Sequence, residues 1–191
     1  MGTRTRTERC RRRCARALLL SAAVALSNGL GAQTPSRSGA LSDLIINLAR
    51  YTNWPTTANR THLTVCYAQG GDLAPAAIDT SDTTTLRGMP VQWRQVQDRS
   101  QLGDCAVLFL NADVWPAPRD WVVAVATKPV LTISNYADFT ADGGIIGAWR
   151  NGEDWRFEIN LEALQRARLN IAAVALRLSQ KPKSHGAERV P

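Results

Sequence analysis

The chain has 191 residues, of which 45% are hydrophobic, and it carries 23 lysine and arginine residues against 16 aspartate and glutamate residues. This length supports one core and is too short for two ordinary domains. Residues 1–32 hold seven of the basic residues and one of the acidic ones, which leaves 16 against 15 in the rest. Nucleic-acid binding needs clustered lysines and arginines, so this nearly neutral remainder excludes nucleic acid as an expected partner.

The N-terminal segment has the residue order of a secretory signal peptide. Seven arginines precede an apolar run at residues 17–26, and Leu30, Gly31 and Ala32 end the segment. A membrane anchor is the competing interpretation, but the ten residues of this run fall short of the roughly 20 that a bilayer-spanning helix needs. We therefore expect residues 1–32 to be a signal peptide, residues 33–39 to be a linker, and the trimmed protein to be exported to an oxidising compartment.

The four cysteines fall into two pairs. Cys10 and Cys14 would leave with the signal peptide, so the trimmed chain has no four-cysteine metal site, while Cys66 and Cys105 would remain. In an oxidising compartment an even pair of cysteines is typical of a disulfide. The alternative is two buried, reduced thiols that act as small hydrophobic side chains.

The first predicted elements are a helix, a strand and a short helix. Residues 41–51 repeat apolar side chains at steps of three and four, and Pro55 closes this helix because the residue before a proline avoids helical angles. Residues 63–68 read as a β-rich strand. A brief helix is expected to begin near Asp72.

The middle of the chain predicts strands around one helix. Residues 89–96 alternate Val91, Trp93 and Gln95 against Gln92, Arg94 and Val96, which suits a strand with one solvated face. Residues 105–110 and 129–134 are continuously apolar, which indicates interior strands covered on both sides. Pro116 and Pro118 confine the intervening helix to about residues 119–126.

The last third predicts an antiparallel hairpin and two helical segments. Two strand-like runs flank Asn151-Gly152, a dipeptide suited to tight turns. Asn160 is a good N-cap for a helix that starts at Leu161, with a break expected at residues 168–170. The polar residues 181–191 are expected to be a disordered tail.

No catalytic constellation or metal site is visible, so we expect a protein that is not an enzyme and needs no cofactor. His62 has no acidic partner nearby in sequence, and His185 lies in the tail. The glycine-rich residues 142–147 precede a hairpin instead of a helix, which favours a turn over a phosphate-binding loop. Asp138 and Asp142 lack the spacing of a calcium loop.

Binding to another protein has better support, because six tryptophans are many for this length. Tyr51, Trp54, Trp115 and Trp121 are placed near loops, and aromatic side chains concentrate at interface hot spots. The alternative is that each ring packs on the core. For the group, we expect an exposed aromatic patch that binds a partner.

Seven segments of the sequence occur in the same order in a known family. They are "LARYTNWP", the strand that carries Cys66, "LRGMPVQWRQV", "LGDCAVLFL", "KPVLTISN", "FTADGGIIG" and "RFEINLEALQRARLNI". Over residues 40–180 the chain resembles the YfiR-like family of periplasmic regulators. The resemblance implies a single α/β domain with a mixed, mostly parallel sheet flanked by helices, three-layered and doubly wound, with a late antiparallel hairpin.

The resemblance also implies a function and a disulfide. Cys66 and Cys105 match the family's linking pair, whereas the second pair that some relatives carry in the hairpin is absent. Arg168 stands where relatives often have glycine. The best-known relatives repress an inner-membrane diguanylate cyclase that makes cyclic-di-GMP, and an outer-membrane lipoprotein sequesters them; a homodimer is expected by analogy. The alternative function is a periplasmic small-molecule-binding domain that feeds a membrane sensor or transporter.

Overall fold

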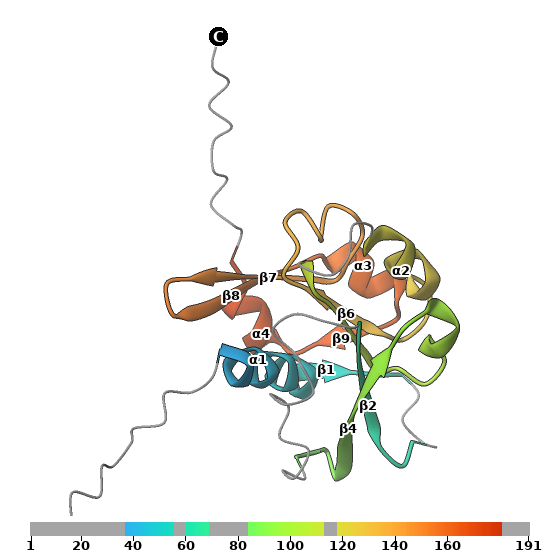
Figure 1. Ribbon diagram of the computed structural model, residues 1–191. Coiled ribbons are helices and arrows are strands. Elements are labelled where there is room, and N and C mark those ends of the chain that lie inside the picture. The colour runs from blue at the N-terminus through green and yellow to red at the C-terminus, as the bar shows by residue number, and fades with distance from the viewer. Residues whose placement is uncertain (1–36, 56–59, 69–83, 113–117, 181–191) are drawn as a thin grey trace, which may run out of the picture. The chain divides into compact units, whose positions relative to one another are not determined.

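The described part of the chain comprises residues 37–55, 60–68, 84–112 and 118–180 of a computed structural model (Figure 1). All of these residues fall in one unit, Pro35–Pro191. The expected signal peptide, the short helix near Asp72, Trp115 and the tail lie outside the described residues. Helix α1 (Arg37–Tyr51) begins inside the stretch expected to be linker.

Seven strands form one sheet in the order β3-β4-β2-β5-β6-β7-β8. Their bounds are β2 (Leu63–Ala68), β3 (Thr85–Leu86), β4 (Met89–Val96), β5 (Val107–Leu110), β6 (Leu131–Ser134), β7 (Ile146–Asn151) and β8 (Asp154–Ile159). The strands from β4 to β7 in this order are parallel, and the edge strands β3 and β8 are antiparallel to their neighbours. The predicted class, a mixed and mostly parallel α/β sheet, is confirmed.

The register of the sheet separates two apolar layers. Val65, Val107 and Leu131 lie side by side on one face and belong to the core under α1. Cys66 and Leu108 are neighbours on the opposite face, in a second core that includes side chains of the helix α2 (Pro118–Val125). Helices therefore cover both faces, and β5 and β6 are buried throughout, as continuously apolar strands require.

A small second sheet was not predicted. Strand β1 (Thr52–Asn53) follows α1 directly and pairs antiparallel with β9 (Asn170–Ile171). The hydroxyl of Thr52 donates to the carbonyl oxygen of Leu48 at 2.8 Å, and the amide of Ala172 donates to the carbonyl of Tyr51 at 2.8 Å. Helix α1 thus ends at Tyr51, where the chain changes to an extended pairing four residues before Pro55.

The predicted hairpin is present, but its turn lies one residue later than expected. Asn151 pairs with Asp154, so the two turn residues are Gly152 and Glu153. Among these turn residues only Gly152 has a positive φ, +65°. A two-residue turn with glycine first needs a positive φ only there, so Asn151 remains a strand residue.

The C-terminal part confirms the predicted cap and break. The side chain of Asn160 accepts a hydrogen bond from the amide of Ala163 and caps α3 (Leu161–Arg166). The chain then turns through Arg168, whose φ is +57°, before β9 and the short helix α4 (Ala173–Leu178). The break therefore falls where it was expected, and an arginine occupies a left-handed backbone position that usually favours glycine.

Candidate functional site

The sulfur atoms of Cys66 and Cys105 form a disulfide that joins neighbouring parallel strands. Cys66 lies in β2, Cys105 lies two residues before β5, and their Cα atoms are 5.7 Å apart. The two residues are 0% and 1% exposed. The two cysteines are 39 residues apart in sequence, and β4 lies between them in the chain. The disulfide therefore joins distant parts of the chain at the centre of the sheet.

The guanidinium group of Arg94 covers this disulfide. Arg94 is the β4 partner of Cys66, and its Nη2 atom lies 3.7 Å from each of the two sulfur atoms. The same nitrogen donates to the carbonyl oxygen of Gln101 at 3.0 Å, and Nη1 lies 3.7 Å from a carboxylate oxygen of Asp104. The Nε atom is buried and has no hydrogen-bond partner among the described residues.

The burial along β4 follows the expected alternation only in part. The side chain of Arg94 is 40% exposed, but its Nε atom is buried and its Nη2 atom lies against both sulfur atoms. Val96, on the same face, is buried in the second core. The alternation along β4 could not reveal that Arg94 lies beside Cys66. This contact depends on the register between β2 and β4 and not on nearby sequence.

Two of the aromatic residues predicted to bind a partner are buried. Trp54 is 8% exposed and its Nε1 atom donates to the carbonyl oxygen of Ala106 at 3.2 Å, while Trp121 is 2% exposed. Both belong to the core, which is the alternative weighed for each single ring, so neither adds to an exposed patch. Tyr51 is half-buried, and Trp115 lies outside the described residues.

Other tryptophans, which the sequence argument left aside, are more accessible. Trp149 and Trp155 lie on opposite faces of the β7–β8 hairpin and are half-buried. The guanidinium of Arg150 lies 5.0 Å from the ring centre of Trp155, and Arg156 is the cross-strand partner of Trp149. Trp149 and Arg156 share one face, and we call this pair the hairpin surface. Trp155, on the other face, packs against the core under α1. The sequence signal that could have indicated these positions is the predicted hairpin, because side chains alternate between the two faces of a strand.

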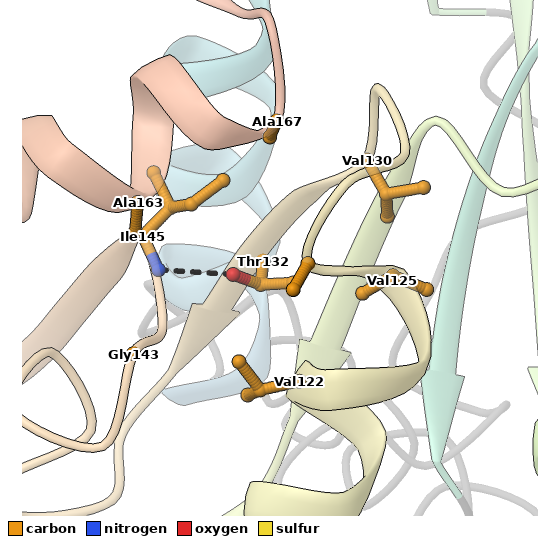
Figure 2. A pocket seen from close by; sticks show the side chains of 9 residues that line it. Val122, Val125, Val130, Thr132, Gly143, Ile145, Ala163 and Ala167 are labelled. Carbon is orange, nitrogen blue, oxygen red and sulfur yellow. Dashed lines mark hydrogen bonds between the residues drawn. The ribbon is translucent and has the colours of Figure 1, made fainter.

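The sheet and two helices also enclose a small apolar crevice (Figure 2). Its walls come from α2, β6, α3 and the turn before β7, and they comprise Val122, Val125, Ala126, Val130, Thr132, Gly143, Ile145, Ala163 and Ala167. The hydroxyl oxygen of Thr132 accepts a hydrogen bond from the amide of Ile145 at 2.9 Å. The crevice has a volume of about 10 Å³. A cavity needs roughly 10–15 Å³ to hold one water molecule, so the crevice has room for one water molecule at most.

The titratable groups show no arrangement for catalysis within the described ranges. The Nδ1 atom of His62 pairs with the hydroxyl of Thr61 at 3.0 Å. Hydrogen bonds from the side chain and the backbone of Ser100 lower the pKa of Asp98, and burial raises the pKa of Tyr67. In the described part of the chain no three His, Cys, Asp or Glu side chains gather as metal ligands.

The turn at residues 142–147 has a structural role. Gly143 has a φ of +95°, and a Cβ atom on Gly144 would lie 2.2 Å from the ring of Phe139. The ring of Phe139 is buried in the second core. The glycines therefore let the chain pass this ring before β7 begins, which agrees with the predicted turn.

Comparison with known proteins adds the family. A family model described as YfiR/HmsC-like matches residues 41–180. The chain belongs to the YfiR/HmsC-like family. Proteins of the YfiR/HmsC-like family are periplasmic regulators of cyclic-di-GMP signalling, not enzymes, and act with membrane signalling proteins.

A search of curated proteins returned no match to the chain. Within the described residues, every helix is too short or too polar to span a bilayer.

Proposed function

We propose that this protein is exported to the periplasm, binds an inner-membrane diguanylate cyclase through its folded domain, and holds that cyclase in a low-activity state. The observation that carries the proposal is the family match over residues 41–180, the same region that forms the α/β domain. The secretory order of residues 1–32 supports the location. Removal of these residues, and release of the repressor by an outer-membrane lipoprotein, are parts of the same proposal.

The hairpin surface is the best-supported contact region within the described residues. Tryptophan and arginine are enriched at interface hot spots because they bury large areas and retain polar groups. Trp149 and Arg156 are half-buried neighbours on one face of the hairpin, so part of each side chain is accessible to a partner. Of the aromatic residues first considered, Tyr51 and Trp115 remain proposed contacts, whereas the buried Trp54 and Trp121 do not.

The proposal is tested by adding the purified protein to each full-length diguanylate cyclase of the same organism, reconstituted in lipid nanodiscs. We expect synthesis of cyclic-di-GMP to fall in a saturable manner. Trp149→Ala should weaken this inhibition at least fivefold in concentration, while Leu161→Ala, an exposed apolar residue of α3, should leave it unchanged. The absence of inhibition with every one of these cyclases would contradict the proposal.

A small-molecule-binding domain receives less support. The crevice between α2 and α3, with a volume of about 10 Å³, is too small for a metabolite. Thermal-shift screening separates the two functions, since a ligand selective for the folded state raises the apparent stability. A large, saturable stabilisation by a metabolite would favour the alternative.

A further inference from the structure

The turn of the β7–β8 hairpin places an asparagine directly before a glycine, and both Asn151 and Gly152 are exposed. The backbone of Asn151 is held in the strand by its pairing with Asp154. By contrast, neither the side-chain amide of Asn151 nor the backbone amide of Gly152 has a hydrogen-bond partner among the described residues. The hairpin therefore leaves these two neighbouring groups free to meet each other.

An asparagine side chain and the backbone nitrogen that follows it can react with each other. The nitrogen attacks the Cγ atom and closes a five-membered ring, and such an attack is fast when the two groups are held close together. Glycine favours the reaction because it has no Cβ atom to obstruct the approach and adopts a wide range of backbone angles. A Cβ atom on Gly152 would meet nothing within 4 Å, so no neighbouring atom crowds the site of attack.

No other described asparagine combines a following glycine with an unbound side chain. Each of them precedes a residue that has a side chain. The side chain of Asn160 donates to the carbonyl oxygen of Thr140 at 2.8 Å and accepts from the amide of Ala163 at 3.0 Å. The side chain of Asn135 is likewise bonded through both of its polar atoms. Asn151 therefore differs from the other described asparagines in both its sequence and its surroundings.

We propose that Asn151 is a site of spontaneous covalent modification, at which water converts the side-chain amide to a carboxylate. The backbone nitrogen of Gly152 forms a bond to Cγ of Asn151, and the side-chain amide group takes up the proton of that nitrogen and leaves as ammonia. Water then opens the resulting imide at one of its two carbonyl carbons. One opening gives aspartate with a normal backbone, and the other gives isoaspartate, in which the backbone runs through the side chain. The reaction needs only water, so it is independent of the proposed membrane client.

The modification changes the charge beside the hairpin surface. Asn151 lies on the same face of the hairpin as Trp149 and Arg156, because side chains alternate along each strand. A carboxylate at position 151 would lie directly opposite Asp154, and like charges in that arrangement destabilise a pair of strands. Asp154 is already paired with Arg156 at 3.2 Å. The new negative charge therefore weakens the end of the hairpin, and isoaspartate also lengthens the backbone there.

The test is a time course of the full-length protein in mildly alkaline buffer, read by mass spectrometry of its peptides and by a methyltransferase that labels isoaspartate. Peptide mapping separates Asn151 from Asn28, which also precedes a glycine. We expect Asn151 to react at least about tenfold faster than Asn160, and its rate in the folded protein to lie within about threefold of the rate in guanidinium chloride. Asn151→Gln is the matched control, because its longer side chain would have to close a six-membered ring, and it should stay unmodified over the same time.

An Asn151 that keeps its amide in the folded protein while the unfolded protein reacts overturns the proposal, because the hairpin would then block the attack. A rate at Asn151 no higher than the rate at Asn160 overturns it equally. The effect of the new charge is measured separately in Asn151→Asp, whose urea midpoint at low salt should lie below that of the parent protein. Added salt should reduce this difference, because it screens the repulsion from Asp154. A midpoint equal to or above that of the parent protein would contradict the expected weakening of the hairpin.

Discussion

The indole nitrogen of Trp54 donates a hydrogen bond to the carbonyl oxygen of Ala106, 3.2 Å away and 52 residues later in the chain. This contact ties the end of α1 to the approach of the central strand β5. The contact also gives each residue of the Trp-Pro dipeptide a role. The ring of Trp54 packs in the core, and the chain bends at Pro55.

Replacement of Trp54 should therefore destabilise the fold through both packing and hydrogen bonding. We expect Trp54→Ala to lower the free energy of unfolding by about 3–5 kcal/mol and Trp54→Phe by about 1–2 kcal/mol. Urea unfolding followed by circular dichroism measures both. Trp149→Ala, at a half-buried position, should lower the free energy of unfolding by clearly less than Trp54→Ala. Equal losses of stability in the two variants would contradict the burial assigned to Trp54.

The disulfide should contribute a large share of the stability. In the chain-entropy description, closing a loop of this length stabilises the fold by roughly 3–4 kcal/mol, against a typical total of about 5–15 kcal/mol. The double variant Cys66→Ala/Cys105→Ala should lose about that amount in urea unfolding. Parent protein treated with dithiothreitol should show a similar midpoint, and an unchanged midpoint in the double variant would mean that the bond does not brace the sheet.

Arg168 occupies a backbone conformation that costs most residues energy. Its φ of +57° lies in the left-handed region, which disfavours side-chain-bearing residues by about 1 kcal/mol and is open to glycine. We expect Arg168→Gly to raise the free energy of unfolding by up to about 1 kcal/mol, and Arg168→Val to lower it by more than that because β-branched residues fit this region worst. Thermal and urea unfolding should give the same order of stability for the two variants. A loss of stability in Arg168→Gly would contradict backbone strain at Arg168.

Two glycines make a matched pair for testing the turn before β7. A Cβ on Gly144 would meet the buried ring of Phe139, whereas a Cβ on Gly103 would meet nothing within 4 Å. Gly144→Ala should therefore lower the free energy of unfolding by about 1–3 kcal/mol. Gly103→Ala, at a right-handed helical φ of −54°, should be neutral or stabilising by up to about 1 kcal/mol. Similar effects in the two variants would contradict the close passage of the chain past Phe139.

Much of the architecture was predictable because local signals decided it. The continuous apolar runs at β5 and β6 predicted strands buried on both faces, and Asn160 predicted the start of α3. The pairing of β1 with β9 was not predictable, because two-residue strands have no periodicity and are defined by a partner about 120 residues away.

The candidate sites were harder to predict, since they depend on which side chains meet. Composition showed that tryptophans were abundant but could not show that Trp54 and Trp121 are in the core while Trp149 is accessible. The position of Arg94 over the disulfide follows from the register of β2 with β4. A shift of one residue would have turned Arg94 to the other face of the sheet.

The cellular concentration of cyclic-di-GMP tests the central claim most directly. It should be measured by mass spectrometry in cells that lack the gene, in the parent strain, and in the deletion strain complemented with the gene. The proposed repression of a diguanylate cyclase predicts a rise on deletion, with more biofilm, and a return to the parental level on complementation. A concentration that does not change on deletion, in unstressed cells and under envelope stress alike, would contradict the account.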